Sequence, residues 1–161
     1  MDKNKRLPSA CIFDFDGVIM DSEKYHHVGW QKVADSLGVE FSYEEYCPLK
    51  SAGRKVVIPY LLKKAGKTAT PEEFERLNDL RVKSMSEQIL HVKKEDILPG
   101  VIDFIRLLKE NGIRTAVASA SVHSKSLAKR FGLLSLFEVF VDGNEGLPHK
   151  PAPDIFLRAA K

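Results

Sequence analysis

The sequence predicts an α/β protein with a parallel sheet and a separate helical region, and three observations carry this prediction. Strand-like and helix-like apolar patterns alternate after residue 100, whereas residues 21–91 show helical spacing without a convincing strand. The run Ile12–Val18 is short and apolar but contains two carboxylates. A length of 161 residues and a hydrophobic content of 43% are ordinary for one globular domain carrying a small insertion.

Residues 10–16 predict a short buried strand. Burying an ionised carboxylate is costly unless it is paired or ligated, so Asp14 and Asp16 together require a compensating cation. Alternate side chains of a strand share a face, so the two carboxylates converge while Phe13 and Phe15 face into the packing. A solvated turn is the alternative, and the flanking apolar residues disfavour it. We therefore predict a carboxylate magnesium site.

Residues 21–91 predict a set of helices, because apolar residues recur there at helical spacing and glycines follow the first two helices. Thr70 is the expected N-cap of a long helix, with Glu73 completing a capping box. Ser42 and Glu45 form a second possible box. We interpret this segment as an inserted helical cap.

The chain after residue 92 alternates helix and strand. Strands are expected at 113–118 and 137–141, and helices follow residues 100, 121 and 153. This alternation predicts a Rossmann-like core with right-handed crossovers, whose ligands bind at the carboxyl ends of the strands. We expect residues 1–20 and 92–161 to form this core. The sheet should be incomplete at its C-terminal end, because no further strand follows.

Polar side chains follow each expected strand. Asp14 and Asp16 end the first, Ser119 and Ser121 follow the second, and Lys150 lies beyond the third. Because Lys150 precedes a proline, its backbone favours an extended shape that can direct the ammonium back toward the sheet edge. A carboxylate nucleophile, a hydroxyl donor and a fixed cation together suit phosphoryl transfer.

Three segments carry a family resemblance, namely Asp14–Val18 with Asp21–Glu23, Ala118–Ser121, and Lys150–Phe156. They resemble the first three motifs of the haloacid dehalogenase superfamily, in the same order. Within that superfamily the chain is most similar to the beta-phosphoglucomutase-like branch, and the similarity extends over nearly its whole length.

The resemblance implies a role for each motif residue. Asp14 would be the nucleophile that becomes an aspartyl phosphate, and it would also bind Mg²⁺. Asp16 would be the general acid and base and would offer its backbone carbonyl to the metal. Ser119, with Ala120 beside it, would hold the phosphoryl group, and Lys150 would pair with that group and with Asp14.

Further roles implied by the resemblance concern the substrate. His26, Arg54 and Ser121 fall where the mutases position the sugar phosphate. A substrate-contacting lysine of the mutase cap corresponds here to Leu77, flanked by Arg76 and with Arg81 nearby. This departure leaves the choice of sugar open.

Simpler interpretations exist for several of these residues. Ser119 alone is a candidate cap for the helix that follows it. Lys150 and Arg54, taken singly, are ordinary surface residues. Asp142 and Glu145 either add acidity beside the third strand or belong to a solvated loop.

Three functions follow, in order of preference. The first is a magnesium-dependent sugar-phosphate mutase working through aspartyl phosphate and a bisphosphate intermediate. The second is a small-metabolite phosphatase in which water accepts the phosphoryl group. The third is a non-catalytic fragment, because the acidic fourth motif of the superfamily would lie past Lys161 and the metal would have a single protein carboxylate. An acidic residue at Asp16 argues against true dehalogenase chemistry.

Charge and cysteine content limit the partners. The formal net charge is +3, from 25 basic and 22 acidic residues that are interspersed, and only the tail Lys3–Arg6 is a basic run. We therefore expect no nucleic-acid groove. Cys11 and Cys47 do not suggest a disulfide framework, and neither a signal peptide nor a membrane span is recognisable. These features predict a cytoplasmic monomer whose partner is a small phosphate ester.

Overall fold

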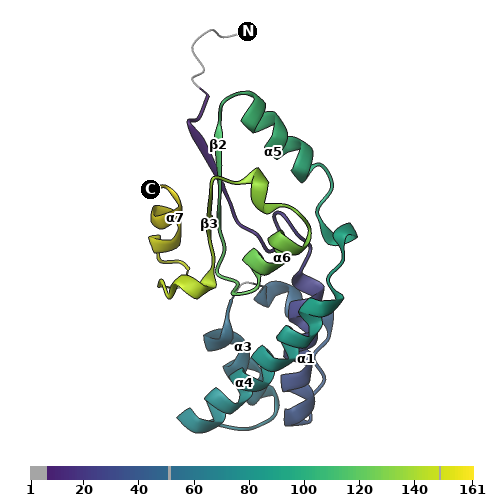
Figure 1. Ribbon diagram of the computed structural model, residues 1–161. Helices are drawn as coiled ribbons and strands as arrows, with labels where there is room; N and C mark the ends of the chain where they lie inside the picture. Colours follow the sequence, from purple (N-terminus) through teal and green to yellow (C-terminus); the bar gives the residue numbers. More distant parts are fainter. Residues whose placement is uncertain (1–6, 51, 149) are drawn as a thin grey trace. The chain divides into compact units, whose positions relative to one another are not determined.

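The computed structural model describes residues 7–50, 52–148 and 150–161, which form two compact units. The α/β unit consists of the chain up to Asp21 together with Lys93–Lys161, and the helical unit is Ser22–Val92. Both can be followed in Figure 1 by the colour of the chain. The basic tail Lys3–Arg6 lies outside the described residues. No helix in the described ranges is long and apolar enough to cross a membrane.

A parallel sheet forms the centre of the α/β unit, as predicted. Its strands are β1 (Ala10–Phe13), β2 (Arg114–Ala118) and β3 (Val139–Val141), in the order β1-β2-β3. Ala10 pairs with Arg114, and Ala118 pairs with Val141. The carboxyl ends of all three strands therefore meet at one edge.

The first strand is shorter than predicted, because it ends at Phe13 and not at residue 16. Beyond Asp14 the chain turns tightly: the carbonyl of Phe15 accepts hydrogen bonds from the amides of Ile19 and Met20, at 2.9 and 3.0 Å. Phe13 and Phe15 are buried, as expected. Asp14 and Asp16 thus lie on a turn at the carboxyl end of β1, both half-buried.

Helices cover both faces of this sheet. Figure 1 shows α5 (Val101–Glu110) and α6 (Ser124–Arg130) on one side and α7 (Asp154–Ala159) on the other. The face under α7 is a small apolar core, against which Leu147 packs, formed by Ala116, Ala118, Val141, Ile155 and Ala159. A short 3₁₀ turn, Gly143–Glu145, links β3 to the segment before α7. Leu147 ties that segment to the core beneath it.

The helical unit contains α1 (Glu23–Leu37), α2 (Tyr43–Tyr46), α3 (Arg54–Lys64) and α4 (Pro71–Gln88), and no strand is found among its described residues. Its core is a continuous apolar cluster that includes Trp30, Val33, Leu37, Phe41, Val57, Ile58, Leu61 and Leu77. The helical spacing of Trp30, Val33 and Leu37, and of Val57 and Leu61, predicted two of these helices from the sequence.

Both predicted capping motifs are present, one of them in full. The Ser42 hydroxyl accepts a bond from the Glu45 amide at 3.2 Å, and the Glu45 carboxylate accepts one from the Ser42 amide at 3.0 Å. Thr70 caps the amide of Glu73 at 3.3 Å. The carboxylate of Glu73, however, binds the guanidinium of Arg76, so that box is only half formed.

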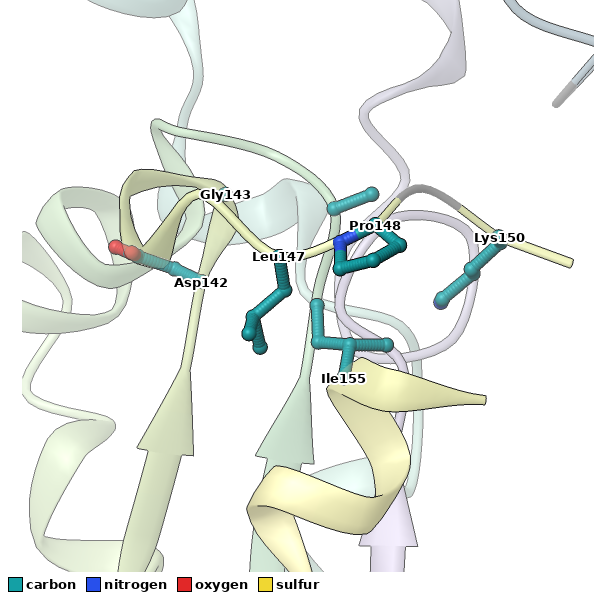
Figure 2. Close-up of a pocket in the computed structure, with 7 residues that line it drawn as sticks. Asp142, Gly143, Leu147, Pro148, Lys150 and Ile155 are labelled. Carbon is teal, nitrogen blue, oxygen red and sulfur yellow. The ribbon is translucent and has the colours of Figure 1, made fainter. Parts of the chain in front are cut away.

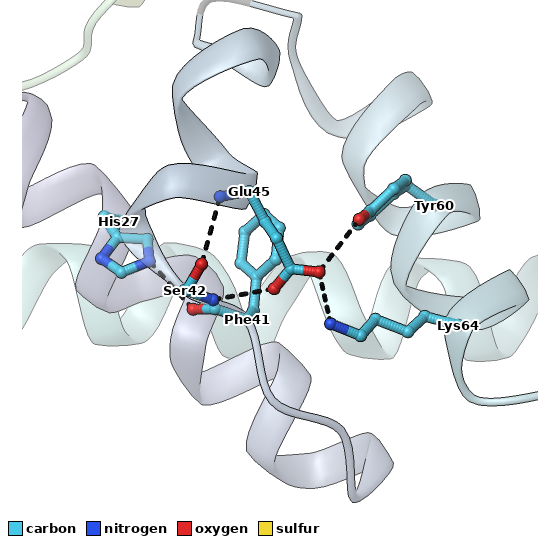
Figure 3. A network of polar contacts seen from close by, with 6 residues as sticks. All are labelled: His27, Phe41, Ser42, Glu45, Tyr60 and Lys64. Atoms are coloured by element: carbon cyan, nitrogen blue, oxygen red, sulfur yellow. Dashed lines mark hydrogen bonds and ion pairs between the residues drawn. The ribbon is translucent and has the colours of Figure 1, made fainter.

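Glu45 is also the centre of a polar network that joins α2 to α3 (Figure 3). The Lys64 ammonium contacts its carboxylate at 2.5 Å, and the Tyr60 hydroxyl does so at 3.3 Å. The Lys64 hydrogen bond, with that from Ser42, lowers the pKa of Glu45 below its ordinary value. Nearby, His27 is buried and its Nε2 lies 3.0 Å from the Phe41 carbonyl oxygen.

Candidate active site

Asp14 and Lys150 are in direct contact although 136 positions separate them in the chain. The Lys150 Nζ lies 2.5 Å from Asp14 Oδ2 and 3.3 Å from the Ala118 carbonyl oxygen. The carboxyl ends of β1 and β2 and the segment after β3 therefore meet at this ion pair. The compensating cation that the sequence required for Asp14 is supplied by the protein itself.

The surroundings of the ion pair fix both partners. Asp14 Oδ1 accepts the Phe15 amide at 2.8 Å, so both carboxylate oxygens are engaged. The Lys150 ammonium lies 4.9 Å from the centre of the Phe156 ring, a cation–π distance. An ammonium has three N–H donors, and two are used on Asp14 and Ala118. Among the described residues the third donor of Lys150 has no hydrogen-bond partner and is left for a ligand.

Ser119 follows β2 directly and is fully buried. Its amide donates to the Val141 carbonyl at 3.0 Å, and its hydroxyl oxygen accepts the Ser121 amide at 3.1 Å. The next helix, α6, has His123 and not Ser119 at its N-cap position. The simpler interpretation of Ser119 as a helix cap is therefore wrong. The hydroxyl proton of Ser119 has no acceptor among the described residues and can be offered to a ligand.

The residues on either side of Ser119 complete a compact loop. Ser121 lies at the same strand end, and its hydroxyl oxygen accepts the His123 amide at 3.3 Å. Ala120 is exposed. It lines a cavity of about 20 Å³, together with Lys150, Asp142 and Gly143, which is room for about one water molecule. Figure 2 shows the residues that line this cavity, with Leu147, Pro148 and Ile155 among them.

Glu145 is exposed, as the solvated-loop interpretation expected, whereas Asp142 is not. Asp142 is buried, and its carboxylate accepts bonds from the amide and side chain of Asn144, both at 3.0 Å. In Figure 2 this carboxylate points away from Lys150. Glu145 pairs with Arg158 at 3.0 Å. Asp142 therefore stabilises the turn after β3, and Glu145 joins that turn to α7.

A metal would find a partial set of ligands here. Asp14 and Asp16 offer carboxylate and carbonyl oxygens at the end of β1, which suits a hard cation such as Mg²⁺. Among the described residues no group of three or more histidine, cysteine or acidic side chains is placed to hold a metal. Mg²⁺ is commonly bound through one or two carboxylates, waters and the phosphates of a substrate, so the residues present fit it.

The substrate-binding candidates of the helical unit lie on its helices. His26 is half-buried on α1. Arg54 begins α3, and its guanidinium pairs with Glu75 at 3.3 Å, with 41% of the Arg54 side chain exposed. An exposed ion pair of this kind contributes little to stability. Arg54 is therefore accessible to a ligand without a large structural penalty.

Leu77, which stands where the resemblance places the mutase cap lysine, is fully buried in the helical core. Arg81 lies one turn further along α4. Its guanidinium lies 4.6 Å from the Trp30 ring, and its Nε is buried without a hydrogen-bond partner among the described residues. Burial lowers the pKa of Arg81. The sequence placed Arg81 only nearby, because spacing alone does not tell which face of α4 packs inward.

Comparison with known proteins places this geometry in a family. Residues 8–161 match the haloacid dehalogenase-like hydrolases. Beta-phosphoglucomutase of Bacillus subtilis is 31% identical over 153 residues, which cover 94% of this chain and 68% of that protein. A phosphorylated carbohydrates phosphatase of Thermotoga maritima is 27% identical over 150 residues, covering 92% of this chain and 67% of its own length.

Solved structures of related enzymes resemble this chain as well. The crystal structure of beta-phosphoglucomutase from Clostridium difficile aligns with a TM-score of 0.79 and 29% identity, covering 96% of this chain and 70% of that one. The structure of Rhodobacter sphaeroides CbbY in complex with xylulose-(1,5)bisphosphate aligns with a TM-score of 0.69 and 26% identity, covering 95% of this chain and 71% of that one. With its Rossmann-like parallel sheet and its Asp14–Lys150 pair at the strand ends, the chain belongs to the haloacid dehalogenase-like hydrolases, an enzyme family of phosphatases and phosphomutases.

Proposed function

We propose that this chain transfers a phosphoryl group through an aspartyl phosphate on Asp14, and that its substrate is a sugar phosphate that it isomerises. The observation that carries the proposal is the contact of Lys150 with Asp14 and with the carbonyl of Ala118, the residue directly before the buried Ser119. A carboxylate nucleophile, a fixed cation and an uncommitted hydroxyl donor are the groups this reaction needs.

In the first step the Asp14 carboxylate attacks phosphorus, and the bond from phosphorus to the ester oxygen breaks. Asp16 donates a proton to the departing oxygen. The Ser119 hydroxyl and the remaining N–H of Lys150 donate to the phosphoryl oxygens and hold them in line. In the second step Asp16 takes the proton of an acceptor hydroxyl, whose oxygen attacks phosphorus and releases Asp14.

Mg²⁺ would be held by the Asp14 carboxylate and the Asp16 backbone carbonyl, and it would neutralise charge on the transferring group. We assign the helical unit, Ser22–Val92, the role of a cap that excludes water from the reaction. We infer that His26, Arg54 and Ser121 position the sugar phosphate, and that Arg81 joins them. The exposed guanidinium of Arg54 supports its assignment.

The acceptor distinguishes the mutase from the second candidate, a phosphatase. A hydroxyl of a sugar phosphate accepts the group in a mutase, whereas water accepts it in a phosphatase. The similarity to the Thermotoga maritima phosphatase favours keeping this second candidate.

The deciding assay supplies a hexose 1-phosphate and Mg²⁺, with and without the corresponding bisphosphate. A mutase forms the 6-phosphate, is stimulated by the bisphosphate and releases little inorganic phosphate. Steady release of phosphate without isomerisation would establish the phosphatase instead. No turnover on a broad panel of phosphate esters would refute both and leave a non-catalytic chain.

A further inference from the structure

Two loops at the active-site edge are fastened to each other. One is Ser119–Val122, after β2, and the other is the turn that begins at Asp142, after β3. The Gly143 amide donates to the Ser121 carbonyl at 3.2 Å, and the Asn144 side chain donates to the Val122 carbonyl at 2.9 Å. We call Asp142–Asn144 the clamp.

Hydrogen bonds within the clamp hold its own shape. The buried Asp142 carboxylate receives both the amide and the side-chain nitrogen of Asn144, at 3.0 Å each. These two hydrogen bonds to Asp142 fix the direction in which the Asn144 side chain points toward Val122. The ion pair of Glu145 with Arg158 ties the same turn to α7, so the turn is anchored on both sides.

Gly143 approaches the other loop more closely than any other residue type would allow. A Cβ atom at this position would overlap the Ala120 carbonyl oxygen and would stand 3.0 Å from the Val122 amide nitrogen. The backbone of Gly143 is not in the left-handed region, so its angles do not require glycine. Glycine is needed here for close approach alone.

A displacement of the Ala120 carbonyl by a side chain at position 143 would reach Ser119 through a single peptide group. The Ala120 carbonyl and the Ser121 amide belong to one planar peptide group and must move together. That Ser121 amide is the donor to the Ser119 hydroxyl oxygen, at 3.1 Å. Displacing the Ala120 carbonyl therefore shifts or removes the bond that orients the Ser119 hydroxyl.

We propose that Gly143 and Asn144 are positioning residues, which act through the Ala120–Ser121 peptide to aim the Ser119 hydroxyl at the transferring phosphoryl group. The proposal rests on the function proposed above, in which Ser119 contacts that group. Catalytic groups must be held to within a fraction of an ångström, and a displacement of about 1 Å can lower the rate about 100-fold.

The test is Gly143→Ala. We expect kcat to fall by about 10- to 100-fold with KM changed by less than about threefold, because the Ser119 bond matters most in the transition state. Gly146→Ala is the matched control: it makes the same change three residues on, where nothing lies within 4 Å of the added Cβ. Its positive φ of 67° predicts some loss of stability, with kcat unchanged. Asn144→Ala should lower kcat by about three- to tenfold, since it removes the two side-chain hydrogen bonds to Val122 and Asp142 but leaves the Gly143 contact in place.

A second measurement does not depend on turnover. Hydrogen exchange of the Ser121 amide, followed by NMR, should quicken in Gly143→Ala and stay unchanged in Gly146→Ala. If Gly143→Ala leaves either kcat or the Ser121 exchange at the wild-type value, the positioning role is wrong. If the wild-type protein turns over no ester, the proposed function fails. Exchange alone then decides whether the clamp orients Ser119: faster exchange upholds it, and unchanged exchange overturns it.

Discussion

The α/β unit and the helical unit hold their candidate residues in different ways. In the α/β unit Asp14, Ser119 and Lys150 follow strands or a loop fastened to strands, and contacts between distant segments hold them. In the helical unit Arg54 and Arg81 project from helices and contact residues of the same unit. The first arrangement fixes side chains through contacts between distant segments, and the second holds arginines through contacts within one unit.

This difference suggests that the two units have different roles in the proposed reaction. Sheet edges are rigid, so we assign the bond-breaking step to the α/β unit. Side chains on helix surfaces can change without disturbing a strand register, so we assign the choice of sugar to the helical unit. Substitutions in the two units should therefore affect kcat and KM differently.

Asp14→Asn should have the largest effect. The amide cannot form an aspartyl phosphate, so we expect sugar-phosphate turnover to fall by at least about 10³-fold. Lys150 would lose its ionic partner, but both side chains are partly exposed, 29% for Lys150 and 37% for Asp14, so the fold should persist. Steady-state kinetics with a circular dichroism spectrum tests this. Full activity in the variant would remove Asp14 from the mechanism.

Arg81→Met tests the role assigned to the helical unit. We expect KM for the sugar phosphate to rise by about tenfold with kcat nearly unchanged, because a binding cation is lost and the apolar contact with Trp30 is kept. Arg76→Met is the matched control on the same helix, since Arg76 pairs only with Glu73 at the surface among the described residues. Equal effects of the two substitutions on KM would contradict a specific role for Arg81.

Phe156→Leu sharpens the comparison within the α/β unit. Removal of the ring leaves the Lys150 ammonium with its two hydrogen bonds, so kcat should fall by only about two- to fivefold, the size of a partly exposed cation–π contact. Phe156→Tyr keeps the ring and should restore kcat. If tyrosine and leucine behave alike, the ring face does not hold Lys150.

The smallest effect is expected from Glu45→Gln in the helical unit. The pKa of Glu45 is lowered in the folded protein, so its contribution to stability is present above the ordinary value of 4.5 and is lost as the pH falls below it. Replacing it should flatten this part of the pH dependence of the unfolding midpoint. Thermal unfolding at pH 6 and pH 3.5 measures the change, with kcat unaffected. Identical pH dependence in both proteins would exclude Glu45 as a contributor.

The sequence predicted the parallel sheet well, because strand and helix periodicities differ strongly and parallel strands end at a common edge. It overestimated β1, since a tight turn after Asp14 keeps the same alternation of apolar and polar residues as a strand. The local capping rule found Ser42 and Glu45 but missed the competition of Arg76 for Glu73.

Within the site, the meeting of Asp14 and Lys150 follows from topology, and the sequence indicated both. The engagement of Phe156, Gly143 and Asn144 does not follow, because it depends on how loops pack after the strands are in place. The burial of Leu77 was likewise not predicted, because its place in a helix was clear but the inward face of that helix was not.

The pairing of β1 with β2 has a consequence for the order of folding. Ala10 must find Arg114, and the whole segment Ser22–Val92 lies between these partners in the chain. Closing so long a connection is slow while it is disordered, and compact folding of the intervening helices shortens it. We expect helix formation to precede sheet formation, and Asp14 to remain without Lys150 until the sheet closes. Such a protein would acquire its reactive carboxylate environment only at the end of folding.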